Sequence, residues 1–221
     1  MASALVFELS KVATLHIREA MVAHLIHVDA AFAQRVADGL GLSKMPEAPP
    51  ALIVQDMDES PSLGLIGKMK NTLEGRCVGI LVNDGSDLNT VTAIETAVLG
   101  AGGDIKMIAP KVGGAKMSDG TLLMADGQLA GTPSVMFDAI AVVLSESGAR
   151  ALFEDSSAKD FVRDAFVHLK AIVFDKGGQS LCEKANISAD QAVFAASDVA
   201  GFIVAATTRQ WGREASVRTL A

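Results

Sequence analysis

The stretch KAIVFDKGGQSL (Lys170–Leu181) decides the fold, because an apolar strand runs there into a glycine-rich turn and then into a helix. Many α/β enzymes mount a catalytic Cys or Ser on such a turn, since the sharp change of direction lifts the side chain above the edge of the sheet. Here Asp175 holds that position, and Lys176, Gly177 and Gly178 follow it. The sequence therefore predicts an enzyme-like scaffold without the usual nucleophile, in a domain that works through packing or contact with a partner.

Short apolar strands alternate with helices along the chain from Gly75 onward. The alternation is typical of an α/β fold with a mostly parallel sheet covered by helices on both faces, a three-layer α/β/α sandwich. Predicted strands cover Arg76–Val82, Asp104–Ala109, Phe137–Leu144 and Lys170–Phe174. Predicted helices cover Leu88–Leu99, Ala158–His168, Gly178–Ala185 and a last segment from Asp198, its cap, to about Gln210. Asp126–Gly127 carries the signal of a β-hairpin between Thr121–Met124 and Gln128–Ala130.

The part of the chain before this alternation predicts a helical arm and a linker. Ser10 is a suitable N-cap for a helix that runs to about His27, with apolar residues at helical spacing. Asp29 begins a second helix, Ala30–Asp38, which two glycines close. The Pro- and Met-bearing stretch Ser43–Thr72 has no strong periodicity. We therefore expect a helical arm at 1–42, a linker at 43–72 and a single α/β domain at 73–221.

The composition excludes several classes of function. The formal charge of −7 argues against a nucleic-acid surface, because phosphate binding needs clustered Lys and Arg. No apolar stretch approaches the length of about 18 residues that a transmembrane helix needs, and the N-terminus lacks a signal pattern, so we expect no membrane contact. Cys77 and Cys182 form no CxxC pair, which favours reduced thiols and a cytoplasmic location.

Polar side chains follow several of the predicted strands. Ligands of open parallel sheets bind beyond the carboxyl ends of the strands, so we expect a crevice at that edge. The side chains that could converge there, called the crevice residues below, are Asp84, Asp87, Ser145, Glu146 and Asp175, and Asn83 lies beside them.

Three interpretations of the crevice compete. A phospho-acceptor domain would use Asp84 and Asp87 as its acid pair, but Ser145 and Glu146 stand where the acceptor Asp belongs. A hydrolase or amidase would use Asp175 as a carboxylate nucleophile, but no His lies in the neighbouring turns to assist it. The favoured interpretation is a vestigial crevice, in which Asp175 caps the following helix and the other polar groups satisfy helix N-termini and turns.

Three further motifs carry little functional signal. Gly64–Lys68 is similar to a phosphate-binding loop but lacks the first Gly and the final Ser or Thr of that motif. His24 and His27 stand three residues apart on a predicted helix without a third ligand, so no metal site is predicted. Cys77 and Cys182 have no adjacent base and are expected to be structural thiols.

Two segments resemble known families. RCVGILVNDGSD (Arg76–Asp87), together with the downstream turn, resembles the class I glutamine amidotransferase-like superfamily. In that superfamily Cys, any residue and Gly form the nucleophile turn, and the matching positions here are Asp175, Lys176 and Gly177. MVAHLIHVDAAFAQRVADGLGL (Met21–Leu42) is similar to the end of the helical region of large-subunit haem catalases, which leads through a linker into a flavodoxin-like C-terminal domain. This second resemblance covers almost the whole chain.

The catalase resemblance implies that the chain is the C-terminal part of an enzyme that converts hydrogen peroxide to water and oxygen. Catalases hold haem iron through a Tyr oxygen, and this chain contains 0 Tyr. The resemblance therefore implies that haem belongs to the parent protein and that this chain has no cofactor. The implied role is a non-catalytic accessory domain that is structural, stabilises the oligomer or acts like a chaperone. Its implied partners are the rest of the parent subunit and its oligomer, unfolded client proteins and further copies of the chain. The alternative is a small-molecule hydrolase or amidase of the amidotransferase-like superfamily that uses Asp175.

Overall fold

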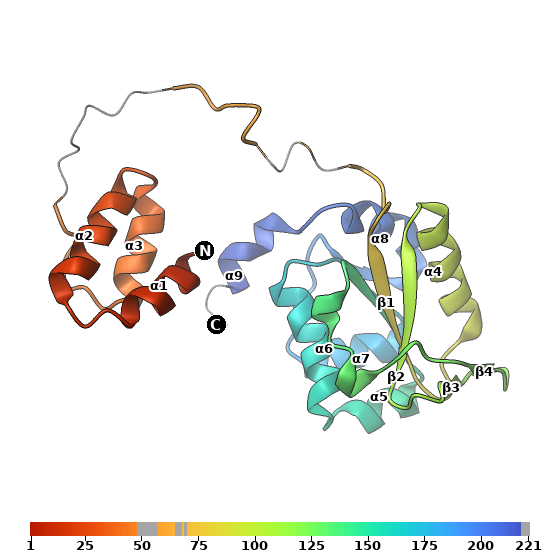
Figure 1. Ribbon diagram of the computed structural model, residues 1–221. Coiled ribbons are helices and arrows are strands. Elements are labelled where there is room, and N and C mark those ends of the chain that lie inside the picture. The colour runs from red at the N-terminus through yellow and green to blue at the C-terminus, as the bar shows by residue number, and fades with distance from the viewer. Residues whose placement is uncertain (48–56, 65–67, 69, 218–221) are drawn as a thin grey trace. The chain divides into compact units, whose positions relative to one another are not determined.

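The computed structural model describes residues 1–47, 57–64, 68 and 70–217 (Figure 1). The chain divides into two compact units, Met1–Gly64 and Leu65–Ala221. Part of the predicted linker and the centre of the phosphate-loop-like segment Gly64–Lys68 lie outside the described residues. None of the helices in the described ranges has both the length and the apolar character needed to span a bilayer.

The described part of the first unit contains three helices, α1 (Ala2–Ser10), α2 (Leu15–Ile26) and α3 (Ala30–Gly39). Small and branched side chains form its core: Ala2, Leu9, Val22, Ala33, Val36 and Ala37. Asp29 caps α3 as predicted, because its carboxylate accepts a hydrogen bond from the backbone N–H of Phe32 at 2.6 Å. The two helices that the sequence predicts are thus joined by a third, and together they enclose an apolar core of their own.

The single helix predicted from Ser10 to His27 is wrong, because the chain breaks between α1 and α2. Thr14 adopts an extended conformation with ψ of 112°. The Arg18 side chain donates to the carbonyl oxygens of Val12 at 2.6 Å and of Ser10 at 3.0 Å, which stabilises the break. Ser10 therefore ends a helix instead of beginning one, and its hydroxyl donates back to a carbonyl of α1.

The second unit is built on a six-stranded sheet in which every neighbouring pair of strands is parallel (Figure 1). The strands in spatial order are β5 (Gly127–Gln128), β2 (Asp104–Ala109), β1 (Cys77–Val82), β6 (Ala139–Val143), β7 (Ile172–Phe174) and β8 (Val193–Ala195). Leaving aside the two-residue β5, the order of the remaining strands is that of flavodoxin-like folds, 2-1-3-4-5. The predicted fold class is confirmed.

Helices cover both faces of this sheet. One face carries α4 (Leu88–Gly100) and α8 (Val199–Ala206). The other face carries α5 (Glu146–Leu152), α6 (Ser156–Val167) and α7 (Lys176–Lys184), and a short α9 (Glu214–Val217) adds Val217 to the core there. Since a central parallel strand is buried on both faces, its residues are apolar throughout. In β1, accordingly, Ile80 contacts the core under α4 while Leu81 contacts the core under α6.

The hairpin predicted at Asp126–Gly127 is wrong. Leu122–Leu123 (β4) pairs antiparallel with Ala115–Lys116 (β3), whereas β5 joins the main sheet beside β2. Asp126 explains the difference, since its N–H donates to the carbonyl of Met107 at 2.8 Å and its carboxylate accepts from the N–H of Met107 at 2.8 Å. These bonds attach the turn to β2, so the segments on either side of Asp126–Gly127 do not pair with each other.

Several short elements have no counterpart in the prediction, α5 and β8 among them, and α8 is shorter than predicted. The seven-residue α5 and the three-residue β8 are too short to produce a periodic pattern. The carboxylate of Asp198 accepts from the N–H of Gly201 at 2.9 Å and caps α8 as predicted. That helix ends at Ala206, well before Gln210.

Candidate functional site

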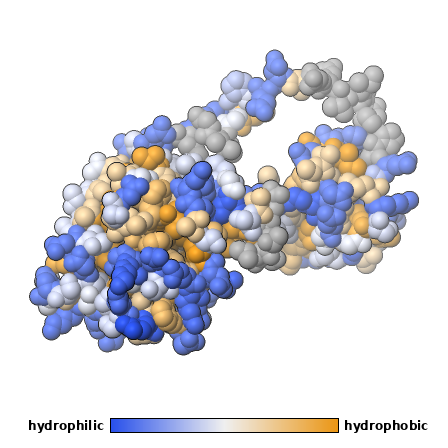
Figure 2. All heavy atoms as spheres, turned by 180° about the vertical axis from the view of Figure 1, so that it is seen from behind, coloured by the Kyte–Doolittle hydropathy of each residue, from blue (hydrophilic) through white to orange (hydrophobic). Residues whose placement is uncertain are grey.

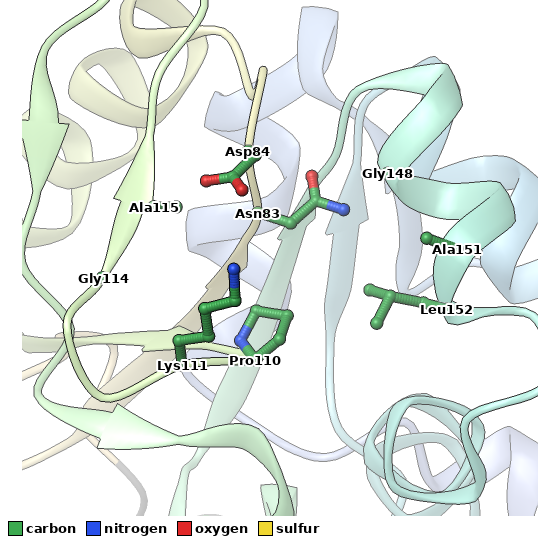
Figure 3. A pocket seen from close by; sticks show the side chains of 9 residues that line it. All are labelled: Asn83, Asp84, Pro110, Lys111, Gly114, Ala115, Gly148, Ala151 and Leu152. Atoms are coloured by element: carbon green, nitrogen blue, oxygen red, sulfur yellow. The ribbon is translucent and has the colours of Figure 1, made fainter.

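The strand order reverses between β1 and β6, and the carboxyl ends of these strands form the candidate site. In folds of this class the crevice at such a switch point is where ligands bind. A cavity of about 290 Å³ opens there, called the switch-point cavity below (Figure 3). It is lined from the ends of β1 and β2 and from α5, with Asn83, Asp84, Pro110, Lys111, Ala151 and Leu152 among its residues.

The turn after β1 is fixed by Ser86, which is fully buried. The Ser86 hydroxyl donates to the carbonyl of Val143 at 2.7 Å and accepts from the N–H of Asn83 at 3.0 Å. These bonds clamp the turn to the end of β6, across the switch point. Sequence reasoning missed Ser86, because its partner lies 57 residues away along the chain.

Asp84 and Ser145 lie together and hold two turns in place. The Asp84 carboxylate accepts from the N–H of Lys116 at 2.9 Å. The Ser145 hydroxyl donates to the carbonyl of Asp84 at 2.8 Å and accepts from the N–H of Gly148 at 3.0 Å, as the N-cap of α5. Both residues therefore connect loops at the sheet edge, and Asp84 also lines the switch-point cavity.

Asp87 and Glu146 have local partners. Asp87 caps α4, accepting from the hydroxyl of Thr90 at 2.7 Å and from its N–H at 2.9 Å. The hydroxyl bond and then the N–H bond hold the pKa of Asp87 below its ordinary value. Glu146 is exposed and pairs with Lys176 at 2.5 Å, and the hydrogen bond and charge of Lys176 lower the pKa of Glu146.

Asp175 is the N-cap of α7. Its carboxylate accepts from the N–H of Gly178 at 2.7 Å and from the N–H of Leu144 at 3.1 Å to each oxygen. Burial raises the pKa of Asp175, although the hydrogen bonds from Gly178 and Leu144 act in the opposite direction. Its backbone is extended, with φ of −86° and ψ of −173°, and so lacks the strain of a turn that presents a nucleophile. The carboxylate is therefore engaged by main-chain donors.

The two glycines after Asp175 allow α7 to begin directly against the end of β6. A Cβ atom on Gly177 would lie 2.0 Å from the carbonyl oxygen of Leu144. A Cβ atom on Gly178 would lie 2.1 Å from the carbonyl oxygen of Val142. Contacts this short leave room only for glycine, so packing by itself accounts for both residues.

The structure places all five crevice residues at the carboxyl edge of the sheet, but only Asp84 among them lines the cavity. Asn83 and Lys111 complete its polar lining. Sequence reasoning noted Asn83 without giving it a role and missed Lys111. Lys111 comes soon after a predicted strand, as the crevice residues do, and this position is the signal that could have identified it.

The remaining candidates lie elsewhere. His24 on α2 and His27, which follows that helix as its C-cap, are exposed. The described residues include no group of three His, Cys, Asp or Glu that could hold a metal ion. Burial raises the pKa of Cys182 to about 12, and burial followed by the charge of Asp104 raises the pKa of Cys77. Raised values keep both thiols protonated and unreactive.

Comparison with known proteins gives matches along nearly the whole chain. Residues 74–210 match the family described as the C-terminal domain found in long catalases, and residues 1–40 match the family described as catalase-related immune-responsive. The chain is 40% identical over 225 residues to "Catalase C" of Rhizobium meliloti, an alignment that covers 98% of the chain and 32% of that protein. It is 31% identical over 220 residues to "Catalase HPII" of Pseudomonas aeruginosa, covering 97% of the chain and 31% of that protein. The chain thus spans about a third of the length of these relatives.

Proposed function

The chain belongs to the family of C-terminal domains of long catalases, and from that premise we propose that it is a non-catalytic accessory domain of a haem enzyme that disproportionates hydrogen peroxide. In this proposal it stabilises the parent subunit and its oligomer in the cytoplasm, where the free Cys77 and Cys182 stay reduced. The observation that carries the proposal is the state of Asp175, the residue that stands where related folds place a nucleophile.

A carboxylate nucleophile needs a free oxygen and a partner that activates water or protonates the leaving group. The Asp175 oxygens instead accept from the N–H groups of Leu144 and Gly178. His168 ends α6, before β7, and so lies at the edge of the sheet opposite to Asp175, which follows β7. These contacts support a helix cap and weigh against the hydrolase or amidase alternative.

The residues of this chain do not fit a haem. A catalase iron is held by a Tyr oxygen, and the chain has 0 Tyr. All four His residues, at positions 16, 24, 27 and 168, are exposed, whereas an axial ligand must point into an enclosed pocket. We therefore assign the haem of the proposed parent to the part of that protein outside this chain.

A role through contact is supported by apolar side chains that remain on the surface of the second unit. Figure 2 shows such side chains among the polar ones there. Val204 on α8 is 71% exposed, and it lines a hollow of about 410 Å³ together with Phe194 and Ala205. We infer that this hollow is one place where the rest of the parent protein contacts the domain.

Oxygen release tests the absence of catalysis. The purified chain, with and without added haem, should release no more oxygen from hydrogen peroxide than buffer or haem alone. A rate that rises in proportion to the concentration of the chain would overturn the proposal. A parallel screen of esters, amides and glyoxals should show no turnover, and turnover that disappears in Asp175→Ala would establish the hydrolase alternative.

The accessory role has a test of its own. Added to a heat-aggregating client enzyme, the chain should suppress light scattering in proportion to its concentration, if it acts like a chaperone. Scattering equal to that with an inert protein of the same mass would remove the chaperone-like part of the proposal. Size-exclusion chromatography with light scattering would then show whether the chain associates with itself, as an oligomer-stabilising domain should.

A further inference from the structure

We propose that the switch-point cavity binds a small aliphatic zwitterion of the amino-acid type. The proposal goes beyond the accessory role and does not depend on it, because it rests on the side chains that line the cavity. Three features carry it: an amide NH₂ group that faces the cavity, two opposite charges that do not pair, and an apolar wall.

The amide belongs to Asn83, whose side chain is among the few buried polar groups of the second unit, with 6% of the residue exposed. Its Oδ1 accepts a hydrogen bond from the Ser86 hydroxyl at 3.2 Å. Its Nδ2 forms no hydrogen bond with the residues that the structure describes, and this atom is not fully enclosed by the protein. Because Asn83 lines the cavity, an acceptor on a bound ligand would supply the missing partner.

Gly148 gives the Asn83 amide its room. A Cβ atom at Gly148 would lie 1.9 Å from Nδ2 of Asn83, so any other residue at this position would displace the amide. Gly148 itself lines the cavity (Figure 3). The first turn of α5 therefore leaves space for the NH₂ group of Asn83, which forms no hydrogen bond with the described part of the second unit.

The two charges belong to Lys111 and Asp84. Both line the cavity, and Figure 3 shows the Lys111 side chain extending toward the side where Asp84 lies. Both residues are exposed, and the described residues include no ion pair between them. The Asp84 carboxylate is held in place by the N–H of Lys116. A ligand that carries both charges would fit between them, with its carboxylate toward Lys111 and its ammonium toward Asp84.

The size and the remaining walls of the cavity restrict the rest of the ligand. A volume of about 290 Å³ lies at the lower end of the range for ligand sites, so the ligand is small. Pro110, Ala151 and Leu152 form an apolar wall that suits an aliphatic body. No aromatic side chain lines the cavity to stack on a flavin or a base, and the carboxylate of Asp84 would repel a phosphate.

Titration of the isotope-labelled chain with L-leucine, followed by NMR, tests this assignment. We expect saturable shifts of the Asn83 side-chain amide and of the neighbouring backbone amides. Two matched analogues separate the charges: 4-methylpentanoate lacks the ammonium group, and 3-methylbutylamine lacks the carboxylate. Each should bind at least about tenfold more weakly than leucine, the loss of one charge-assisted hydrogen bond.

Variants locate the site without unfolding the chain. Lys111→Gln removes the cation, Asp84→Asn removes the charge but keeps an acceptor for the N–H of Lys116, and Ala151→Leu fills the cavity from an exposed position on α5. Each should weaken leucine binding at least about tenfold. The matched controls Lys106→Gln and Ala93→Leu change exposed positions outside the cavity and should bind as the wild type does. Absence of saturable shifts, equal binding of 4-methylpentanoate, or binding unchanged in Lys111→Gln would each overturn the proposal.

Discussion

The carboxylate of Asp175 accepts a hydrogen bond from the backbone N–H of Leu144, with 3.1 Å from the nitrogen to each oxygen. Leu144 immediately follows β6, so this bond joins the turn after β7 to the end of the neighbouring strand. The same carboxylate accepts from Gly178 in the first turn of α7. The residue at the tip of an enzyme-like turn therefore links two strands and a helix, and the surrounding residues should respond to substitution as structural residues do.

Substitution of either glycine in the first turn of α7 should destabilise the fold. In Gly177→Ala and Gly178→Ala the new Cβ atom would meet a carbonyl oxygen at 2.0 Å and 2.1 Å, so the helix must move away from β6. We expect a loss of about 3 kcal/mol in the free energy of unfolding, measured by urea denaturation. Gly100→Ala is the control, because a Cβ atom there would meet nothing within 4 Å. A Gly177→Ala protein as stable as this control would contradict the packing argument.

Arg213 should be a main determinant of stability at the C-terminal end. Its buried guanidinium donates to Asp190 at 2.6 and 2.9 Å and to the carbonyls of Phe166 and Lys170 at 3.0 Å each. Arg213→Met removes these bonds and leaves the Asp190 carboxylate without its cation, which should cost about 3 to 5 kcal/mol in urea denaturation.

An exposed arginine on α5 provides the control for Arg213. Arg150 lies 3.9 Å from Glu146 in an exposed ion pair, so Arg150→Met should cost less than about 1 kcal/mol. Equal losses in the two variants would show that burial of the Arg213 network contributes little.

The Asp190 interaction should make stability depend on pH in the acid range. Burial by itself would raise the pKa of Asp190, but the hydrogen bonds from Arg213 and Ala192 and the charge of Arg213 outweigh it and lower the pKa. A lowered pKa means that this stabilisation is complete above the unfolded value, about 3.9, and is lost as pH falls through the folded value. The stability difference between wild type and Asp190→Asn should therefore shrink as pH falls from 7 toward 3. A difference that stays constant over this range would contradict the assignment.

Much of the α/β unit follows from local sequence. The strand Asp104–Ala109 has the predicted bounds, since a short segment with several apolar residues between glycine-rich turns is a local signal. Asp29, Asp175 and Asp198 cap helices as predicted. A cap depends on one side chain and the N–H groups a few residues after it, so residue type and position suffice to identify it.

The features that the sequence could not predict depend on side-chain contacts that the local patterns of helices and strands do not encode. The break between α1 and α2 is held by Arg18, which lies inside α2. The failed hairpin results from the bonds between Asp126 and Met107, 19 residues apart. The cavity has the same origin, because only the strand order brings Asn83 close to Lys111 and Gly148.

Unfolding free energies of the wild type, Asp175→Asn and Asp175→Ala test the central claim most directly. Asn keeps an oxygen that accepts from the N–H of Leu144 or Gly178, and it removes a carboxylate whose pKa is raised by burial. The stability of Asp175→Asn at pH 7 should therefore lie within about 1 kcal/mol of the wild type. Ala leaves both N–H groups without an acceptor and should lose about 1 to 3 kcal/mol. An Asn variant as unstable as the Ala variant, or an Ala variant as stable as the wild type, would contradict the account.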